Sequence, residues 1–218
     1  ITSNSPSVCT VVGNVVTIVG VGTCSLTANQ GGGTSGGTTY NPASPVTITF
    51  TVSPATLTIT ATNISVHYGD GIPPVSYTAS GYVLNENSSV LTVLPVCTTT
   101  YVSTDAVSAA GTRNTSCSGA AADNYQFTYV AGTVTIVRAP LTVTASTHHL
   151  YIGDLAPTIT ASYSGFVNGQ TASVISSQTC TTVYTNSSAV GSHAANCASG
   201  TTANYTITYV AGAVIVTD

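Results

Sequence analysis

The chain has 218 residues, with only two basic and six acidic side chains and a formal net charge of −4. Ordinary globular domains carry about a quarter charged residues, and disordered chains combine low hydrophobicity with high net charge. At 43% hydrophobic residues, the sequence fits neither class. The charge provides no basic footprint for nucleic acid, and no apolar run is long enough for a membrane span. We therefore expect no nucleic-acid partner and no membrane insertion, with any signal or anchor outside these residues.

Apolar residues recur with a period of two along the chain. Four segments show this alternation with threonine, beginning at Val46, Leu57, Val134 and Leu141. β-Branched residues alternating with threonine are typical of half-buried strands. No segment combines a 3.6-residue period with capping signals, so we expect almost no helix. Short strands with turns every eight to twelve residues favour antiparallel β-sandwiches.

Glycine marks the expected turns and loops. The GGGTSGG stretch at 31–37 predicts a flexible loop between a strand ending near Ala28 and one starting near Val46. The two YVAG segments suggest hairpins, each with a strand ending at Val130 or Val210, a tight Ala-Gly turn and a return strand. Further turns are expected at Gly69-Asp70, Gly111 and Gly153-Asp154.

Two stretches are one module written twice. LTITA at Leu57 and LTVTA at Leu141 are each followed by a Gly-Asp turn, a proline, Gly-aromatic-Val, two cysteines and a closing NYxxTYVAG segment. Repetition at domain length indicates a tandem array. Ser-Pro-Ala at 53–55 and Arg-Ala-Pro at 138–140 read as short, stiff linkers. The predicted domains are residues 1–53, 54–138 and 139–218.

Six cysteines form three close pairs, one in each predicted domain. We expect the disulfides Cys9–Cys24, Cys97–Cys117 and Cys180–Cys197, and with them an oxidising compartment. Metal binding is the competing interpretation, but no pair has zinc-site spacing and none lies beside a histidine. Each disulfide would contribute roughly 3 kcal/mol in the chain-entropy model.

Residues 57–218 resemble the YGX-type MBG repeats of large bacterial surface and secreted proteins. The signature is LTxTA, the Tyr68-Gly69-Asp70 turn, a proline, Gly-[Tyr/Phe]-Val and NYxxTYVxGxxxV, with Ile152 replacing the tyrosine in the second copy. Residues 1–53 resemble the second half of a bacterial Ig-like repeat, in PSVCTVVGNVVTIVGVGTCSLTANQ and YNPASPVTITFTV. These resemblances imply tandem Ig-like β-sandwich domains, an extracellular adhesin-like or stalk-like architecture, a chain that starts inside its first domain, and no catalytic activity.

Asp70 and Asp154 occupy matching positions beside glycine and allow two interpretations. Aspartate next to glycine is a common turn former, whereas a calcium site needs six or more oxygens, and each module has few carboxylates. Asp123 is not repeated, because Ala203 takes its place.

The histidines offer no recognisable metal or catalytic spacing. His148 and His149 are adjacent on a predicted strand and point to opposite faces, and His67 and His193 have no partner in sequence. No serine has a recognisable base and orienting group. We expect no enzyme, no metal and no cofactor.

Ten tyrosines could stack on sugars, although such residues more often fill sandwich cores. They are Tyr68, Tyr77, Tyr82, Tyr101, Tyr125, Tyr129, Tyr163, Tyr184, Tyr205 and Tyr209. A carbohydrate-binding module array, with surface glycans as partners, is therefore the alternative function.

The function expected from the sequence is a non-enzymatic extracellular stalk or filament subunit on the bacterial surface, used in cell adhesion. The first domain lacks opening strands, which a neighbouring copy could supply by strand complementation. The expected donor is a terminal segment, near Ile1 or at Val214–Asp218. Alternatively, the missing strands precede Ile1 in a longer polypeptide, and the partners are its neighbouring repeats.

Overall fold

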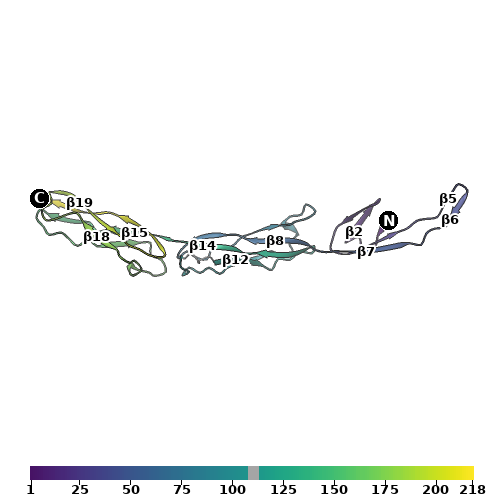
Figure 1. Cartoon of the computed structure of the whole chain (residues 1–218), viewed down its shortest axis with the longest axis horizontal. Coiled ribbons are helices and arrows are strands. Elements are labelled where there is room, and N and C mark those ends of the chain that lie inside the picture. Colours follow the sequence, from purple (N-terminus) through teal and green to yellow (C-terminus); the bar gives the residue numbers. More distant parts are fainter. Residues whose placement is uncertain (108–112) are drawn as a thin grey trace. The chain divides into compact units, whose positions relative to one another are not determined.

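The computed structural model describes residues 1–107 and 113–218, so the turn expected at Gly111 lies outside the described residues. Strands form nearly all of its regular structure, which confirms the all-β class (Figure 1). The helices among the described residues are two short 3-10 turns, Ser88–Val90 and Ala172–Val174. In the same ranges, no helix is long and apolar enough to cross a membrane.

The contacts within the chain divide it into two compact units. Unit 1 comprises Ile1–Ala61, Tyr77–Cys97 and Cys117–Val130, and unit 2 comprises Thr62–Ser76, Thr98–Ser116 and Ala131–Asp218. The division runs inside the first sequence repeat. The boundaries 1–53, 54–138 and 139–218, which follow the repeat itself, stay a prediction.

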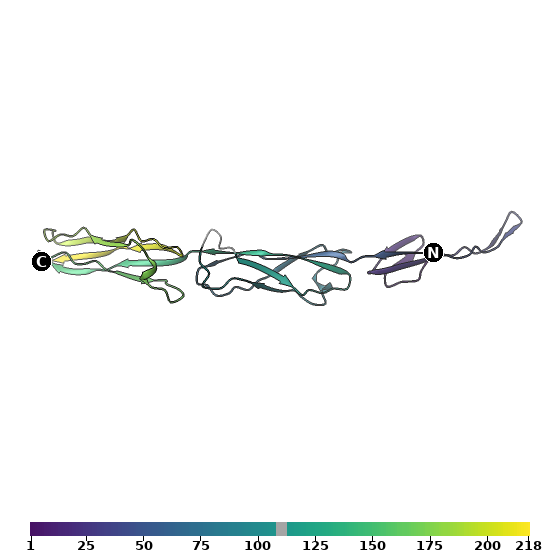
Figure 2. The ribbon, with the colours of Figure 1, turned by 60° about the horizontal axis from the view of Figure 1, so that its bottom comes forward.

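The first predicted domain lies wholly in unit 1. Its three-stranded antiparallel sheet has the order β1 (Thr2–Ser3), β4 (Gly22–Ala28) and β7 (Val46–Val52). A hairpin of β2 (Cys9–Val12) and β3 (Val15–Ile18) covers β4. The glycine-rich loop runs from β4 to β7 as expected. It contains a small hairpin, β5 (Gly33–Ser35) and β6 (Thr38–Tyr40), that stands away from the sheet (Figure 2).

The second repeat lies in unit 2 and is a two-sheet sandwich. One sheet has the order β17 (Ala161–Ser164), β15 (Ala139–Ala145) and β20 (Tyr205–Val210). The other has the order β16 (His148–Tyr151), β21 (Gly212–Thr217), β19 (Gly191–Ala198) and β18 (Thr179–Thr182). Val143, Val214 and Val216, no more than 1% exposed, lie in the core between the sheets.

The first repeat has the same strand orders. One sheet has the order β10 (Tyr77–Ser80), β8 (Ala55–Ala61) and β13 (Tyr125–Val130). The other has the order β11 (Val96–Thr99), β12 (Arg113–Ser118), β14 (Gly132–Val137) and β9 (Ile64–His67). The predicted strands at Leu57, Val134 and Leu141 are therefore confirmed, and the sequence repeat is a repeat of topology.

The sheets are mixed rather than purely antiparallel. In the second repeat, β15 pairs in parallel with β20 and β16 pairs in parallel with β21. The first segment of the module forms β15 in one sheet and, after Ala145, β16 in the other. The last segment likewise forms β20 in one sheet and, after Ala211, β21 in the other. The two segments pair with each other in both sheets, so the beginning of the module is paired with its end.

The hairpins expected at the YVAG segments are wrong. β20 and β21 belong to different sheets, as do β13 and β14, so each Ala-Gly is a crossing between sheets. Gly212 is required by close approach rather than by a turn, because a Cβ there would lie 2.3 Å from the Ser146 carbonyl oxygen. The backbone at Gly212 passes the point where β15 gives way to β16, and no side chain fits between them.

The linker into the second repeat is shorter than expected. Only Arg138 separates β14 from β15, because Ala139 and Pro140 are already paired with Tyr205 and Thr206. A proline is accommodated this near the start of a strand. Two residues, Ser53 and Pro54, separate β7 from β8.

Candidate functional site at the module junctions

One loop in each module, after its third strand, is fixed by a buried tyrosine. We call residues 81–86 and 165–170 the proximal loops. In the second repeat, the Tyr205 hydroxyl donates to Gln170 Oε1 (2.6 Å) and accepts the Val167 N–H (3.2 Å). Asn168 and Gly169 have positive φ angles of 53° and 67°, so the loop turns sharply at two left-handed residues.

The first repeat repeats this arrangement with a charged partner. The Tyr125 hydroxyl donates to the Glu86 carboxylate and accepts the Val83 N–H (2.9 Å). Burial raises the pKa of Tyr125, and its hydrogen bond to Glu86 raises it further. The tyrosine therefore stays protonated and holds the loop over the neutral pH range.

The asparagine before each of these tyrosines reaches the preceding domain. Asn204 Oδ1 accepts the backbone N–H of Val107 (2.9 Å), and Asn124 Oδ1 accepts that of Val21 (3.0 Å). Both partners are main-chain groups. The contact therefore requires an exposed N–H but no particular side chain, and the same asparagine serves two unrelated preceding sequences.

The junction in unit 2 is closely packed. Gly69 has a φ of +90°, and a Cβ there would lie 2.3 Å from a methyl group of Val167. Tyr68 packs edge-on against Tyr205, with ring centroids 5.7 Å apart. Both tyrosines belong to one buried cluster that also contains Val134 and Leu141, so the core is continuous across the junction.

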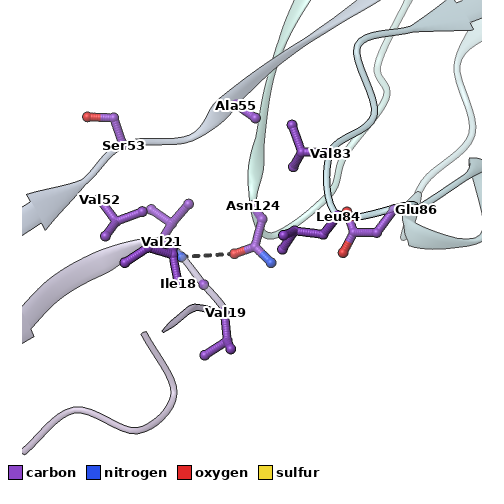
Figure 3. A pocket seen from close by; sticks show the side chains of 11 residues that line it. Ile18, Val19, Val21, Val52, Ser53, Ala55, Val83, Leu84, Glu86 and Asn124 are labelled. Atoms are coloured by element: carbon purple, nitrogen blue, oxygen red, sulfur yellow. Dashed lines mark hydrogen bonds between the residues drawn. The ribbon is translucent and has the colours of Figure 1, made fainter. Parts of the chain in front are cut away.

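The junction in unit 1 contains a small apolar cavity of about 70 Å³ (Figure 3). Val19 and Val21 line it from the first domain, and Val83 and Leu84 line it from the proximal loop. Binding sites for small molecules usually have about 300–1,000 Å³. This cavity is a packing gap at the junction.

The two aspartates beside glycine each cap a turn. Asp70 Oδ2 accepts the His67 N–H (2.7 Å), and Asp154 Oδ2 accepts the Tyr151 N–H (2.8 Å). This is the capping geometry of a turn former. Asp123 is exposed.

The histidines are placed separately. His148 and His149 lie on β16 as expected, and His148 Nε2 contacts Ser146 Oγ (2.8 Å). His193 Nε2 lies 2.8 Å from the Ala189 carbonyl oxygen, and His67 lies 3.7 Å from Asp70. No three metal-ligating side chains gather within residues 1–107 and 113–218.

The disulfides join Cys9 to Cys24, Cys97 to Cys117 and Cys180 to Cys197, the pairs expected from the sequence. The first ties the β2–β3 hairpin to β4 and is fully buried. The other two are different in kind, because each joins neighbouring strands of one sheet. Cys180 on edge strand β18 lies opposite Cys197 on β19. The bond therefore holds an edge strand on its sheet, where edges are otherwise open to pairing with other chains.

Half of the tyrosines proposed for sugar stacking are buried. Tyr129 is 38% exposed, and its hydroxyl accepts the Ala120 N–H (2.8 Å). The buried ones, each no more than 6% exposed, are Tyr68, Tyr101, Tyr125, Tyr184 and Tyr205. These five rings are packed inside the modules or at the module junctions.

The first domain presents an open apolar face on β7. Val46, Ile48 and Phe50 are 61%, 59% and 42% exposed. Leu26 and Cys24, which lie opposite Ile48 and Phe50 on β4, are buried under the β2–β3 hairpin. β7 is also the edge strand of its sheet among the described residues. The alternation at Val46 therefore gives a strand as predicted, but its apolar side is uncovered rather than half-buried.

The comparison with known families identifies the repeated module. The family model of the MBG domain (YGX type) matches residues 57–135 and 141–214, more than two thirds of the chain. The chain belongs to this family. No curated protein matches the chain. The similarity of residues 1–53 to a bacterial Ig-like repeat stays a prediction.

Proposed function

We propose that this chain is a non-enzymatic structural subunit of a bacterial surface stalk or filament, and that a neighbouring copy completes its first domain by strand complementation. The tandem YGX-type modules and three disulfides indicate an extracellular protein. Within each module, the repeated side chains serve turns, core and junctions. That use of the repeated residues supports a mechanical role.

The observation that carries the proposal is the open face of β7. Three large apolar side chains lie side by side on an edge strand, and the main-chain groups along its outer edge have no strand partner within residues 1–107 and 113–218. An added strand would pair with this edge and bring alternate apolar side chains next to the open face. The chain has few charges with which to guard such an edge.

The C-terminal segment does not serve as the donor in the folded module. β21 lies between β16 and β19, and its Val214 and Val216 are almost completely buried. The expectation of a donor at Val214–Asp218 is therefore wrong, because removing this strand would open the core of the second repeat. The remaining candidate is the segment near Ile1. Ile1 itself is 56% exposed, and the segment would have to give up the two-residue pairing of β1 with β4 to act as a donor.

The competing arrangement is completion of the first domain by strands of its own polypeptide. Light scattering of the full chain over a range of concentrations distinguishes the two. Complementation between copies predicts a mass that rises with concentration. Ile48→Asp, which places a charge on the open face, should keep the chain monomeric, whereas Thr49→Asp on the opposite face should not. A wild-type monomer at high concentration would contradict assembly.

Carbohydrate binding remains the second candidate because of one surface cavity in unit 2. It measures about 350 Å³ and is lined by Arg138, Thr201, Thr206 and Tyr209. Several of its polar groups already have partners: Arg138 Nε donates to the Ala203 carbonyl oxygen, and the Tyr209 hydroxyl accepts the Gly200 N–H. Binding of the monomer to a glycan array, lost in Tyr209→Ala, would favour this function over a structural one.

A further inference from the structure

The two modules carry the same distal end, but only one of these ends is covered. We define the distal end as the Gly-Asp turn with the residue before it, together with the valine six residues after the next buried tyrosine. In the first repeat these are Tyr68, Gly69 and Val107, all in contact with the second repeat. In the second repeat the equivalent residues are Ile152, Gly153 and Val190.

The exposure of the two ends differs sharply. Tyr68 is 5% exposed, whereas Ile152 is 58% exposed. Gly69 and Gly153 have φ angles of +90° and +88°, yet a Cβ on Gly69 would collide with Val167, and a Cβ on Gly153 would meet nothing within 4 Å. The uncovered end of the second repeat also presents Tyr151, Leu155 and Val190, which are 67%, 81% and 48% exposed.

The uncovered end already has the shape of the covered one. Tyr101 and Tyr184 are buried at equivalent positions, and their hydroxyls donate to the carbonyl oxygens of Asp70 (2.9 Å) and Asp154 (2.7 Å). The carboxylates of both aspartates cap the same turn. The turn of the second repeat is therefore held in place without the partner that covers its counterpart, so docking would not have to order it.

We propose that the distal end of the second repeat is a docking surface for the proximal loop of a further YGX-type module. The incoming loop would place its valine over Gly153, as Val167 lies over Gly69. Its asparagine would accept the Val190 N–H, as Asn204 accepts that of Val107. Ile152 would present an aliphatic surface to the incoming tyrosine ring, where Tyr68 presents an aromatic edge.

The occupant is a module with a free proximal loop rather than a second copy of this chain. Both proximal loops of the chain are engaged, since Asn124 binds Val21 and Asn204 binds Val107. The proposal is independent of β7, so its failure leaves strand complementation untouched.

The test uses the full chain with a second copy of residues 139–218 appended after Asp218. Thr217 and Asp218 occupy the positions of Val137 and Arg138, so the appended copy begins in register. The readout is hydrogen exchange of the backbone amide of Val190 in the original second repeat, and its rate is compared between the original and the extended chain. Docking should slow this exchange roughly fivefold or more, the effect expected of one gained hydrogen bond.

Two variants of the appended copy make the result specific. The Asn204→Ala change in that copy should return the Val190 exchange toward its original rate. The matched change Asn196→Ala, at an exposed asparagine on β19, should leave the protection in place. Equal Val190 exchange in the original and extended chains would overturn the proposal. An appended copy that fails to fold would also overturn it, because the second repeat folds on the equivalent surface of the first.

Discussion

At the scale of single residues, Asn204 is one of the side chains that link two predicted domains. Replacing it with alanine leaves the Val107 N–H without its acceptor in a half-buried contact. We expect Asn204→Ala to lower the free energy of unfolding by about 1 kcal/mol. Denaturant titration measures this loss. Asn196→Ala, at an exposed position, should change stability by less than about 0.5 kcal/mol, and equal losses in the two variants would contradict the role of Asn204.

Asp105 provides a pH-dependent contribution at the same scale. Its carboxylate accepts hydrogen bonds from the Arg113 guanidinium and the Val102 N–H, and these lower its pKa from 3.8 to about 2. Because the folded-state pKa is depressed, the stabilisation is present above about pH 4 and is lost as the pH falls toward 2. Asp105→Asn should be less stable than the wild type at neutral pH.

The difference in stability between the wild type and Asp105→Asn should shrink as the pH falls from 4 to 2. Unfolding titrations at several pH values test this, and Arg113→Gln should show the same pattern because it removes the other partner of the pair. A constant difference across this range would mean that Asp105 contributes through something other than its charge.

At the scale of elements, the Cys180–Cys197 disulfide holds edge strand β18 on its sheet. The bond closes a loop with a sequence separation of 17 residues. The double variant Cys180→Ala/Cys197→Ala should lose about 3 kcal/mol of stability through the greater freedom of the unfolded chain. Thermal melts with and without reductant check this value. A melting temperature that does not respond to reductant in the wild type would refute the stabilising role of all three bonds.

A second prediction at this scale concerns Gly212, where the chain crosses from one sheet to the other. Gly212→Ala places a methyl group against the Ser146 carbonyl oxygen and should destabilise the module by about 1–3 kcal/mol. Gly71→Ala is the control, because a Cβ at Gly71 meets nothing within 4 Å and its φ is not positive. Chemical denaturation of both variants provides the comparison, and an unaffected Gly212→Ala protein would show that the crossing has room for a side chain.

Period-two alternation predicted the strands at Leu57 and Leu141 correctly, because half-buried strands show their geometry in the local sequence. The crossings could not be predicted in this way. A glycine needed for close approach, such as Gly212, looks the same in sequence as a glycine needed for a turn. What covers a strand is likewise decided by other parts of the fold, so the alternation at Val46 did not reveal an open face.

The junction asparagines were missed because asparagine beside tyrosine has no distinctive local signal. Their repetition as Asn124 and Asn204, each directly before the buried tyrosine, was the available clue. The partner atoms, the N–H groups of Val21 and Val107, have no sequence signature because they belong to the main chain. A functional contact of this kind becomes visible only in three dimensions.

At the scale of the whole molecule, the scarcity of charge and the open edge of β7 both favour association between copies. Surfaces of soluble monomers are usually rich in mixed charges and free of large apolar patches. This chain has eight charged residues and three adjacent exposed apolar side chains on an edge strand. We therefore expect association between copies to be its normal state at high concentration.

The most direct test is electron cryomicroscopy of the assembled full chain, at a resolution that traces strands. We predict an additional strand from a neighbouring copy, paired with the edge of β7, that brings apolar side chains next to Val46, Ile48 and Phe50. An assembly in which β7 stays uncovered, or in which the covering strand belongs to the same polypeptide, would contradict it.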